Sequence, residues 1–101
     1  MTPYITCAAN WVQDGWLHVH QPRGIETGYV VAGHRHHNCF YTMSLINPSI
    51  PRTDKVVQGF LTSDGRFVDR VEALAIARAA GQLEGRTKYR PLDELLSEDI
   101  Y

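Results

Sequence analysis

QGFLTSDGRFVDRVEALAIARAAG, residues 58–81, is the stretch that decides the fold of this chain. The apolar run at residues 56–61, interrupted only by Gln58 and Gly59, predicts a buried strand. Residues 63–65, Ser-Asp-Gly, then predict a turn in which the glycine adopts a positive φ. Asp69 is placed to cap a helix, with a glutamate three residues later that can satisfy a second backbone N–H group. We therefore expect a strand, a tight turn and a helix.

The helix of this unit is rich in alanine between residues 71 and 80, and Gly81 follows as a left-handed stop. Alanine lets a neighbouring backbone approach closely, so the helix is expected to lie flat on a sheet. Arg66 and Arg70 flank its start, close to the hydroxyl group of Thr62. Hydroxyl groups, guanidinium groups and free N–H groups at a helix N-terminus suit an anion such as phosphate. A purely structural role, in which these residues only cap the helix and pair on the surface, remains open.

The remaining sequence predicts further strands and helices. Strands are expected at residues 4–9, 16–20 and 27–33, with Asp14-Gly15 as a two-residue hairpin turn and Leu17 and Val19 facing the core. Helices are expected at residues 39–46, capped by Asn38, and at residues 91–96. The prediction is a single α+β domain over residues 1–101. It contains an antiparallel β-sheet of four to five strands with two or three short helices packed on one face.

Composition excludes several classes of protein. The chain has 101 residues, of which 44% are hydrophobic and 21% charged, as in one globular domain with a modest core. Such a core favours a homo-oligomer, which would bury additional surface. The net charge of −1 shows no basic excess, so we expect no long nucleic acid as a partner. No apolar run is long enough for a membrane span, the N-terminal residues do not resemble a signal peptide, and the two cysteines are expected to be reduced.

A polar cluster at residues 33–40 raises the question of metal binding or catalysis. His34, His36, His37 and Cys39 are competent ligands, but the segment lacks CxxC, HExxH and a second distant ligand set. We therefore expect no metal and no cofactor. Cys39 shares a predicted helix face with Met43, which points it toward the core. A small nucleotide hydrolase or metal-dependent enzyme that uses the cluster is kept as an alternative.

The residue types favour binding over catalysis. Arg35, Arg66 and Arg70 carry planar, permanently charged guanidinium groups that suit phosphate. Flat aromatic side chains could stack on a base, and these are Tyr29, Phe40, Tyr41, Phe60 and Phe67. A site made from these groups would accept a nucleotide and would hold no obvious nucleophile.

Two motifs connect the chain to a family. G-x-R-H-x-N-C at residues 33–39 and Q-G-F-L-T-S-x-G-R-F-V-D-R-x-E-A at residues 58–73 are the main ones, together with Ala77, Gly81-Gln82 and the closing residues 97–101. With these the chain resembles a family of small bacteriophage proteins that includes the first type of Thoeris anti-defence sponge. The resemblance implies a sheet-plus-helix protomer in a homo-oligomer, expected to be a hexamer. Such proteins sequester cyclic ADP-ribose isomers made by a host TIR-domain enzyme, and some hold cyclic oligonucleotides at a separate site. They bind without cleaving.

The resemblance implies that the protein acts in the host cytoplasm. It also suggests which positions bind the ligand. The positions that match the two motifs are Arg35, His36, Phe60, Thr62, Arg66, Asp69 and Arg70. We expect them to form one pocket, completed by a second subunit. The C-terminal residues Ile100 and Tyr101 either dock onto a neighbouring subunit or over the ligand, or form a frayed terminus, and both alternatives stay open. The chain departs from the family pattern at Asn38 and Gly65, where Asp and Asn are expected, and the second departure bears on ligand identity. A structural phage protein without a small ligand is the third hypothesis.

Overall fold

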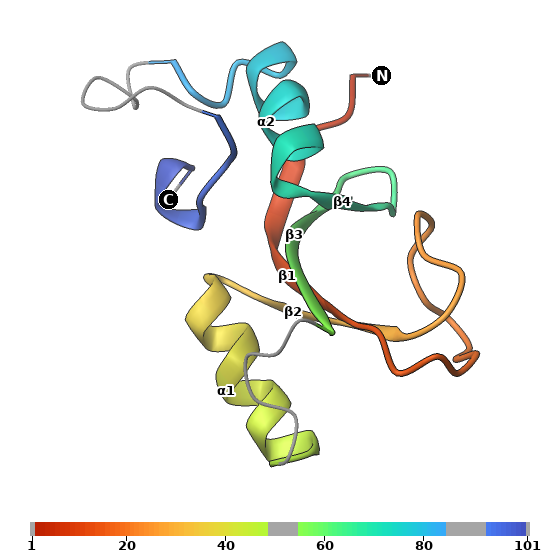
Figure 1. Ribbon diagram of the computed structural model, residues 1–101. Helices are drawn as coiled ribbons and strands as arrows, with labels where there is room; N and C mark the ends of the chain where they lie inside the picture. The colour runs from red at the N-terminus through yellow and green to blue at the C-terminus, as the bar shows by residue number, and fades with distance from the viewer. Residues whose placement is uncertain (1, 49–54, 85–92, 101) are drawn as a thin grey trace.

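A computed structural model describes residues 2–48, 55–84 and 93–100. Its elements in chain order are β1 (Ile5–Val12), β2 (Tyr29–Gly33), α1 (His36–Ile46), β3 (Val56–Thr62), β4 (Phe67–Asp69), α2 (Arg70–Ala79) and the 3₁₀ turn η1 (Ser97–Asp99). The strands form one sheet in the order β2-β1-β3-β4, and every neighbouring pair is antiparallel (Figure 1). The predicted α+β fold with a four-stranded antiparallel sheet is confirmed.

Both helices and the C-terminal segment cover one face of the sheet. On that face α1 lies against β1 and β2, whereas α2 contacts β1, β3 and β4 (Figure 1). The buried cluster between the layers comprises Ile5, Ala8, Val12, Val31, Cys39, Met43, Phe60, Val68, Ala73, Leu74, Ala77, Leu83 and Leu95. Ala73 and Ala77 have no exposed surface, so α2 lies close against the strands, as its alanine content predicts.

The strand-turn-helix unit forms largely as predicted. Gly65 adopts φ +80° in the turn, and Gly81 adopts φ +74° after α2. The Oδ1 atom of Asp69 accepts hydrogen bonds from the N–H groups of Val71 (3.0 Å) and Glu72 (2.8 Å). Two details differ from the prediction: the three-residue strand β4 precedes the helix, and the Glu72 carboxylate accepts a hydrogen bond from Arg66 Nη1 at 3.1 Å.

The predicted hairpin at Asp14-Gly15 is wrong. Residues 13–28 form a loop, because β1 already pairs with β2 on one side and β3 on the other and has no free edge for residues 16–20. The Asp14 carboxylate instead accepts the Trp16 N–H at 2.9 Å, which makes a local turn. Leu17 and Val19, which the sequence predicts to face the core, are 83% and 79% exposed, and the neighbouring Trp16 is 73% exposed.

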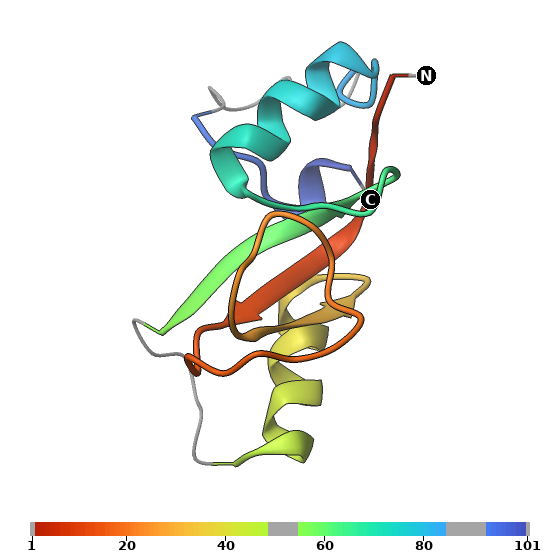
Figure 2. The ribbon, with the colours of Figure 1, turned by 90° about the vertical axis from the view of Figure 1, so that its right-hand side faces the viewer.

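A short piece of this loop, residues 21–23, connects the two outer strands of the sheet. The side chain of Gln21 accepts the backbone N–H of Val30 on β2 at 2.9 Å. Two residues later, the carbonyl of Arg23 accepts the N–H of Phe67 on β4 at 2.7 Å, and its N–H donates to Gly65 O at 2.9 Å. We call residues 21–23 the edge bridge. The sheet is strongly curved, and loop 13–28 lies on the side opposite α1 (Figures 1 and 2).

The ends of several elements differ from the sequence prediction. The strand predicted at residues 4–9 continues to Val12 as β1, and the strand predicted at residues 27–33 begins at Tyr29 as β2. Helix α1 begins at His36, three residues early, and the Asn38 side chain accepts the Arg35 N–H at 3.0 Å from within the first turn. Of the predicted helix at 91–96, residues 91 and 92 lie outside the described part, and residues 93–96 are not helical. Among the described residues, no helix has the length and apolar character needed to span a bilayer.

Candidate functional site

The seven residues predicted to form one pocket lie on two sides of the sheet. Phe60 belongs to the core under the helices, and His36 and Arg70 lie beside it on that face. Asp69 lines a pocket on the loop-covered face, and Arg66 is paired with a residue of the same pocket. The two remaining residues, Arg35 and Thr62, precede α1 and end β3. Within the single chain, the structure therefore does not assemble these residues into one site.

His36 connects α1, β3 and the C-terminal segment in the interior. Its Nε2 lies 2.8 Å from Gly59 O, and its Nδ1 lies 3.4 Å from Ser97 Oγ. Because a carbonyl oxygen only accepts, Nε2 carries the proton and Nδ1 accepts from the serine hydroxyl. Burial lowers the pKa of His36, the hydrogen bond to Gly59 opposes this, and the charge of Arg70 lowers it further. The ring therefore favours its neutral form and holds three segments together.

Phe60 packs beside this histidine and contributes no surface to a ligand. The two rings meet edge to face, with centroids 5.0 Å apart and an interplanar angle of 85°. Phe60 has no exposed surface. In this structure it cannot stack on a base, although its aromatic character suggested that role.

His36 and Arg70 bring the starts of the two helices near each other on the helix-covered face. These residues are the first of α1 and α2, and the charge of Arg70 acts on the histidine ring. Arg70 Nη2 donates to Gln58 Oε1 at 2.7 Å, whereas its buried Nε has no hydrogen-bond partner among the described residues. Two helix N-termini and a guanidinium group give this region a positive potential. The carboxylate of Glu98 is close enough to oppose it in part.

The histidine and cysteine cluster is dispersed by the fold. Cys39 is fully buried, and burial raises the pKa of its thiol to about 11, so it remains protonated at neutral pH. His34 and His37 are exposed, whereas His36 is buried. Among the residues that the structure describes, no three His, Cys, Asp or Glu side chains gather as they would to hold a metal ion.

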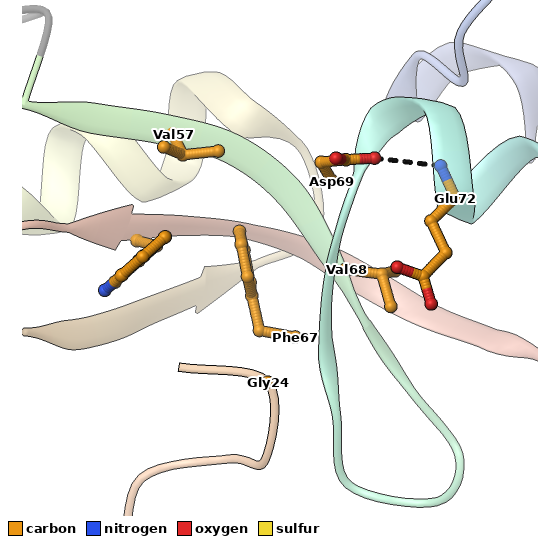
Figure 3. A pocket seen from close by; sticks show the side chains of 7 residues that line it. Gly24, Val57, Phe67, Val68, Asp69 and Glu72 are labelled. Carbon is orange, nitrogen blue, oxygen red and sulfur yellow. Dashed lines mark hydrogen bonds between the residues drawn. The ribbon is translucent and has the colours of Figure 1, made fainter. Parts of the chain in front are cut away.

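A pocket of about 330 Å³ opens on the loop-covered face of the sheet (Figure 3). Its lining comprises Trp11, Gly24, Val57, Phe67, Val68, Asp69 and Glu72. Two aromatic rings form part of the wall: the centroids of Trp11 and Phe67 lie 6.0 Å apart with an interplanar angle of 60°. The indole is oriented by a hydrogen bond from Nε1 to Thr27 O at 2.8 Å. We call this the Trp11–Phe67 pocket.

A glycine makes the aromatic contact possible. Trp11 is on β1 and Phe67 on β4, with β3 between them. Gly59 is the residue of β3 that lies under β4, where an added Cβ would clash with the backbone oxygen of Val68 and would come within 2.7 Å of the Phe67 ring atom Cζ. Because Gly59 has no side chain, the ring of Phe67 can cross β3 toward the indole.

The rim of the pocket is acidic, with a paired arginine next to it. Asp69 and Glu72 stand at the start of α2 (Figure 3). Arg66 contacts Glu72 Oε2 through Nη1 at 3.1 Å and Asp64 Oδ2 through Nε at 3.3 Å. The hydroxyl group of Thr62 donates to Asp64, and this bond, then Arg66, lowers the pKa of that carboxyl. Thr62 also accepts the Arg66 N–H at 3.0 Å, so it shapes the turn.

These groups suit recognition of a flat polar ring. The aromatic wall offers stacking surface, and the carboxylates accept hydrogen bonds from amino or hydroxyl groups. The seven described residues of the lining include no His, Cys, Ser or Lys. Of these seven, the sequence indicates Phe67 and Asp69 for binding, but not Trp11 or Val57. A glycine in a buried strand, facing the ring of Phe67, is the signal that could have indicated the pocket.

Comparison with known proteins gives one relationship. A family model described as "Phage T4 y16D protein" matches residues 4–101, nearly the whole chain. No curated protein and no solved structure matches the chain.

Proposed function

This chain belongs to the phage T4 y16D protein family, and from that premise we propose that it sequesters a cyclic nucleotide immune signal without cleaving it. The ligand class is a cyclic ADP-ribose isomer, or a related cyclic oligonucleotide, held in the host cytoplasm. The protein acts as a homo-oligomer, expected to be a hexamer.

The Trp11–Phe67 pocket is the observation that supports this proposal. Its volume of about 330 Å³ is at the small end for ligand sites, so it accepts a base and part of a sugar but not a complete cyclic dinucleotide. The base would lie against the aromatic wall. The carboxylates of Asp69 and Glu72 would accept hydrogen bonds from amino or sugar hydroxyl groups.

The phosphates of such a ligand must lie outside this acidic rim. Arg66 places a guanidinium group at this rim, since it contacts Glu72 directly. Arg35 and Arg70 are associated with the opposite, helix-covered face of the same protomer. They can reach a ligand in the Trp11–Phe67 pocket only from a second copy of the chain, which is a reason to propose a site shared between subunits.

Binding is favoured over hydrolysis by the state of the alternative catalytic groups. Cys39 is buried, with a thiol pKa of about 11, and both ring nitrogens of His36 take part in hydrogen bonds. A nucleophile needs an accessible reactive form and a base in reach. The geometry of this cluster therefore gives no support to a nucleotide hydrolase.

The experiment is calorimetric titration of the protein with cyclic ADP-ribose isomers and cyclic di- and trinucleotides, followed by heat release and mass analysis. We expect tight binding of at least one ligand and its recovery unchanged. No binding across the panel, or a ligand recovered with altered mass, would contradict the proposal.

Asp69→Asn locates the site without removing the helix cap, because asparagine caps a helix as well as aspartate. Loss of the rim charge should weaken binding about tenfold, as expected for one hydrogen bond to a charged group. The melting temperature should stay unchanged. Glu84→Gln is the control, since this exposed carboxylate does not line the pocket. Equal affinities for both variants would place the ligand elsewhere.

A further inference from the structure

The outward side of α1 is unusually apolar. Tyr41, Leu45 and Ile46 are 67%, 69% and 58% exposed, while Cys39 and Met43 on the inward side are buried. Tyr41 and Leu45 are four residues apart and therefore neighbours on the helix surface. We call Tyr41, Leu45 and Ile46 the outer face of α1.

This helix also lacks charged residues. Its eleven residues, HHNCFYTMSLI, include no Asp, Glu, Lys or Arg. A helix face in contact with water normally carries such residues. The other helix does: α2 contains Arg70, Glu72 and Arg78, and Val71 is its only large hydrophobic residue with high exposure. The outward side of α2 therefore suits contact with water, whereas the outward side of α1 suits contact with another apolar surface.

Both outer strands of the sheet are already engaged by the edge bridge. Gln21 takes the Val30 N–H of β2, and the Arg23 backbone pairs with β4. Association by addition of a strand would have to displace these bonds. A helix surface is the simpler route to assembly.

We propose that two copies of this chain associate through the outer face of α1, about a two-fold axis. In such a contact the same patch occurs on both partners, so each charged residue near the axis would meet its own like charge. An uncharged patch can pack against the same patch of a second copy without such electrostatic repulsion. An anionic membrane or a charged partner protein would instead be matched by lysine, arginine or carboxylate groups, which this helix lacks. The inference rests on the homo-oligomer of the proposed function and identifies one of its contacts.

The proposed two-fold arrangement predicts a specific contact between the two α1 helices. With the two helices antiparallel across the axis, Leu45 of one copy lies against Tyr41 of the other. Tyrosine and leucine at such a centre bury large apolar area, and the ring's hydroxyl group can remain at the rim.

The test measures mass by light scattering coupled to size-exclusion chromatography, over a hundredfold range of protein concentration. The wild type should be an assembly larger than 11.4 kDa. Leu45→Lys should reduce the assembly to half its mass or less, because two ammonium groups would face each other. Leu17→Lys is the control, a still more exposed leucine (83% against 69%) in loop 13–28, and should assemble like the wild type. Circular dichroism melting establishes that each variant is folded, and Tyr41→Lys serves as a second interface variant.

Three results would overturn the inference: a monomeric wild type at every concentration, assembly of Leu45→Lys and Tyr41→Lys identical to that of the wild type, or dissociation caused by Leu17→Lys alone. The last would place the contact at the loop. Calorimetry on the same samples separates this inference from the proposed function, because a monomer that still binds a cyclic nucleotide would contradict the homo-oligomer and the shared site but leave sequestration of the ligand standing.

Discussion

His36 illustrates how one side chain can serve stability where the sequence suggests ligand binding. It is the first residue of α1, and it contacts the carbonyl of Gly59 and the hydroxyl of Ser97. These partners are 23 and 61 residues away in the chain. A neutral imidazole satisfies one acceptor and one donor at the same time, which a buried position requires.

Protonation of this histidine should destabilise the protein. Burial lowers the pKa of His36 in the folded state below its ordinary value of 6.5. Below pH 6.5 the unfolded chain therefore binds a proton that the folded chain does not, and the free energy of unfolding falls until the folded pKa is passed. Urea denaturation between pH 7.5 and 5 should show this loss. His36→Gln should reduce the slope, whereas His37→Gln, at an exposed position, should not. Equal slopes for the two variants would exclude this role.

At the scale of residues, the sequence predicted what local chemistry determines. The Asp69 cap and the positive φ of Gly65 and Gly81 depend on neighbours within a few positions, and all three are confirmed. The burial of His36 depends on segments far away in the chain and could not be read from spacing, whereas Phe60 lies in the strand that the apolar run predicts to be buried. Their residue types fit a ligand site and a core equally well.

Among the elements, β3 determines the shape of the candidate site. It pairs with β1 and β4 and provides, at Gly59, the gap across which the Phe67 ring passes. Any side chain at position 59 would compete with the Phe67 ring for the same space.

Gly59→Ala should therefore lower stability and distort the Trp11–Phe67 pocket. The added methyl group meets the Phe67 ring and the backbone of Val68. Overpacking of this kind costs about 1–3 kcal/mol of unfolding free energy, measurable by chemical denaturation. Gly65→Asn is the matched control, because nothing lies within 4 Å of its would-be Cβ and asparagine tolerates a positive φ. A Gly59→Ala protein as stable as the wild type would refute this account of the glycine.

The hairpin at Asp14-Gly15 shows why element prediction failed in the first part of the chain. A two-residue turn signal was present, but the edges of β1 were taken by β2 and by β3, which is more than forty residues away. Competition from a distant strand is not visible in local pattern. Helix α1 was predicted, although its start was placed late because Arg35, at the cap position, makes no side-chain capping bond.

For the whole molecule, the edge bridge explains how a curved sheet of four strands is held. Residues 21–23 bond to both β2 and β4, so the loop fixes the distance between the outer strands over the candidate pocket. The sequence predicted the sheet and its helix-covered face, but it indicated only a loop at these positions. Curvature and register also place the seven expected ligand residues on two faces, which spacing alone could not show.

Gln21→Ala should loosen this connection. The variant leaves the Val30 N–H without its side-chain acceptor, a loss of about 0.5–1.5 kcal/mol. Hydrogen exchange read by mass spectrometry should show faster exchange in peptides that contain Val30 and loop 13–28, with little change in α2. Gln13→Ala is the control, since the backbone bond from the Gln13 N–H to Lys55 O remains. Unchanged exchange at Val30 would show that the side chain does not hold the edge.

The edge bridge affects the concentration that the protein can reach without aggregating. A sponge of the proposed kind performs no turnover, so each captured molecule of signal occupies a binding site and the protein must accumulate in proportion to its target. At such concentrations, bare strand edges of neighbouring molecules would pair and precipitate. Gln21 and Arg23 occupy backbone groups on both outer strands, which should limit such pairing if the protein acts as proposed.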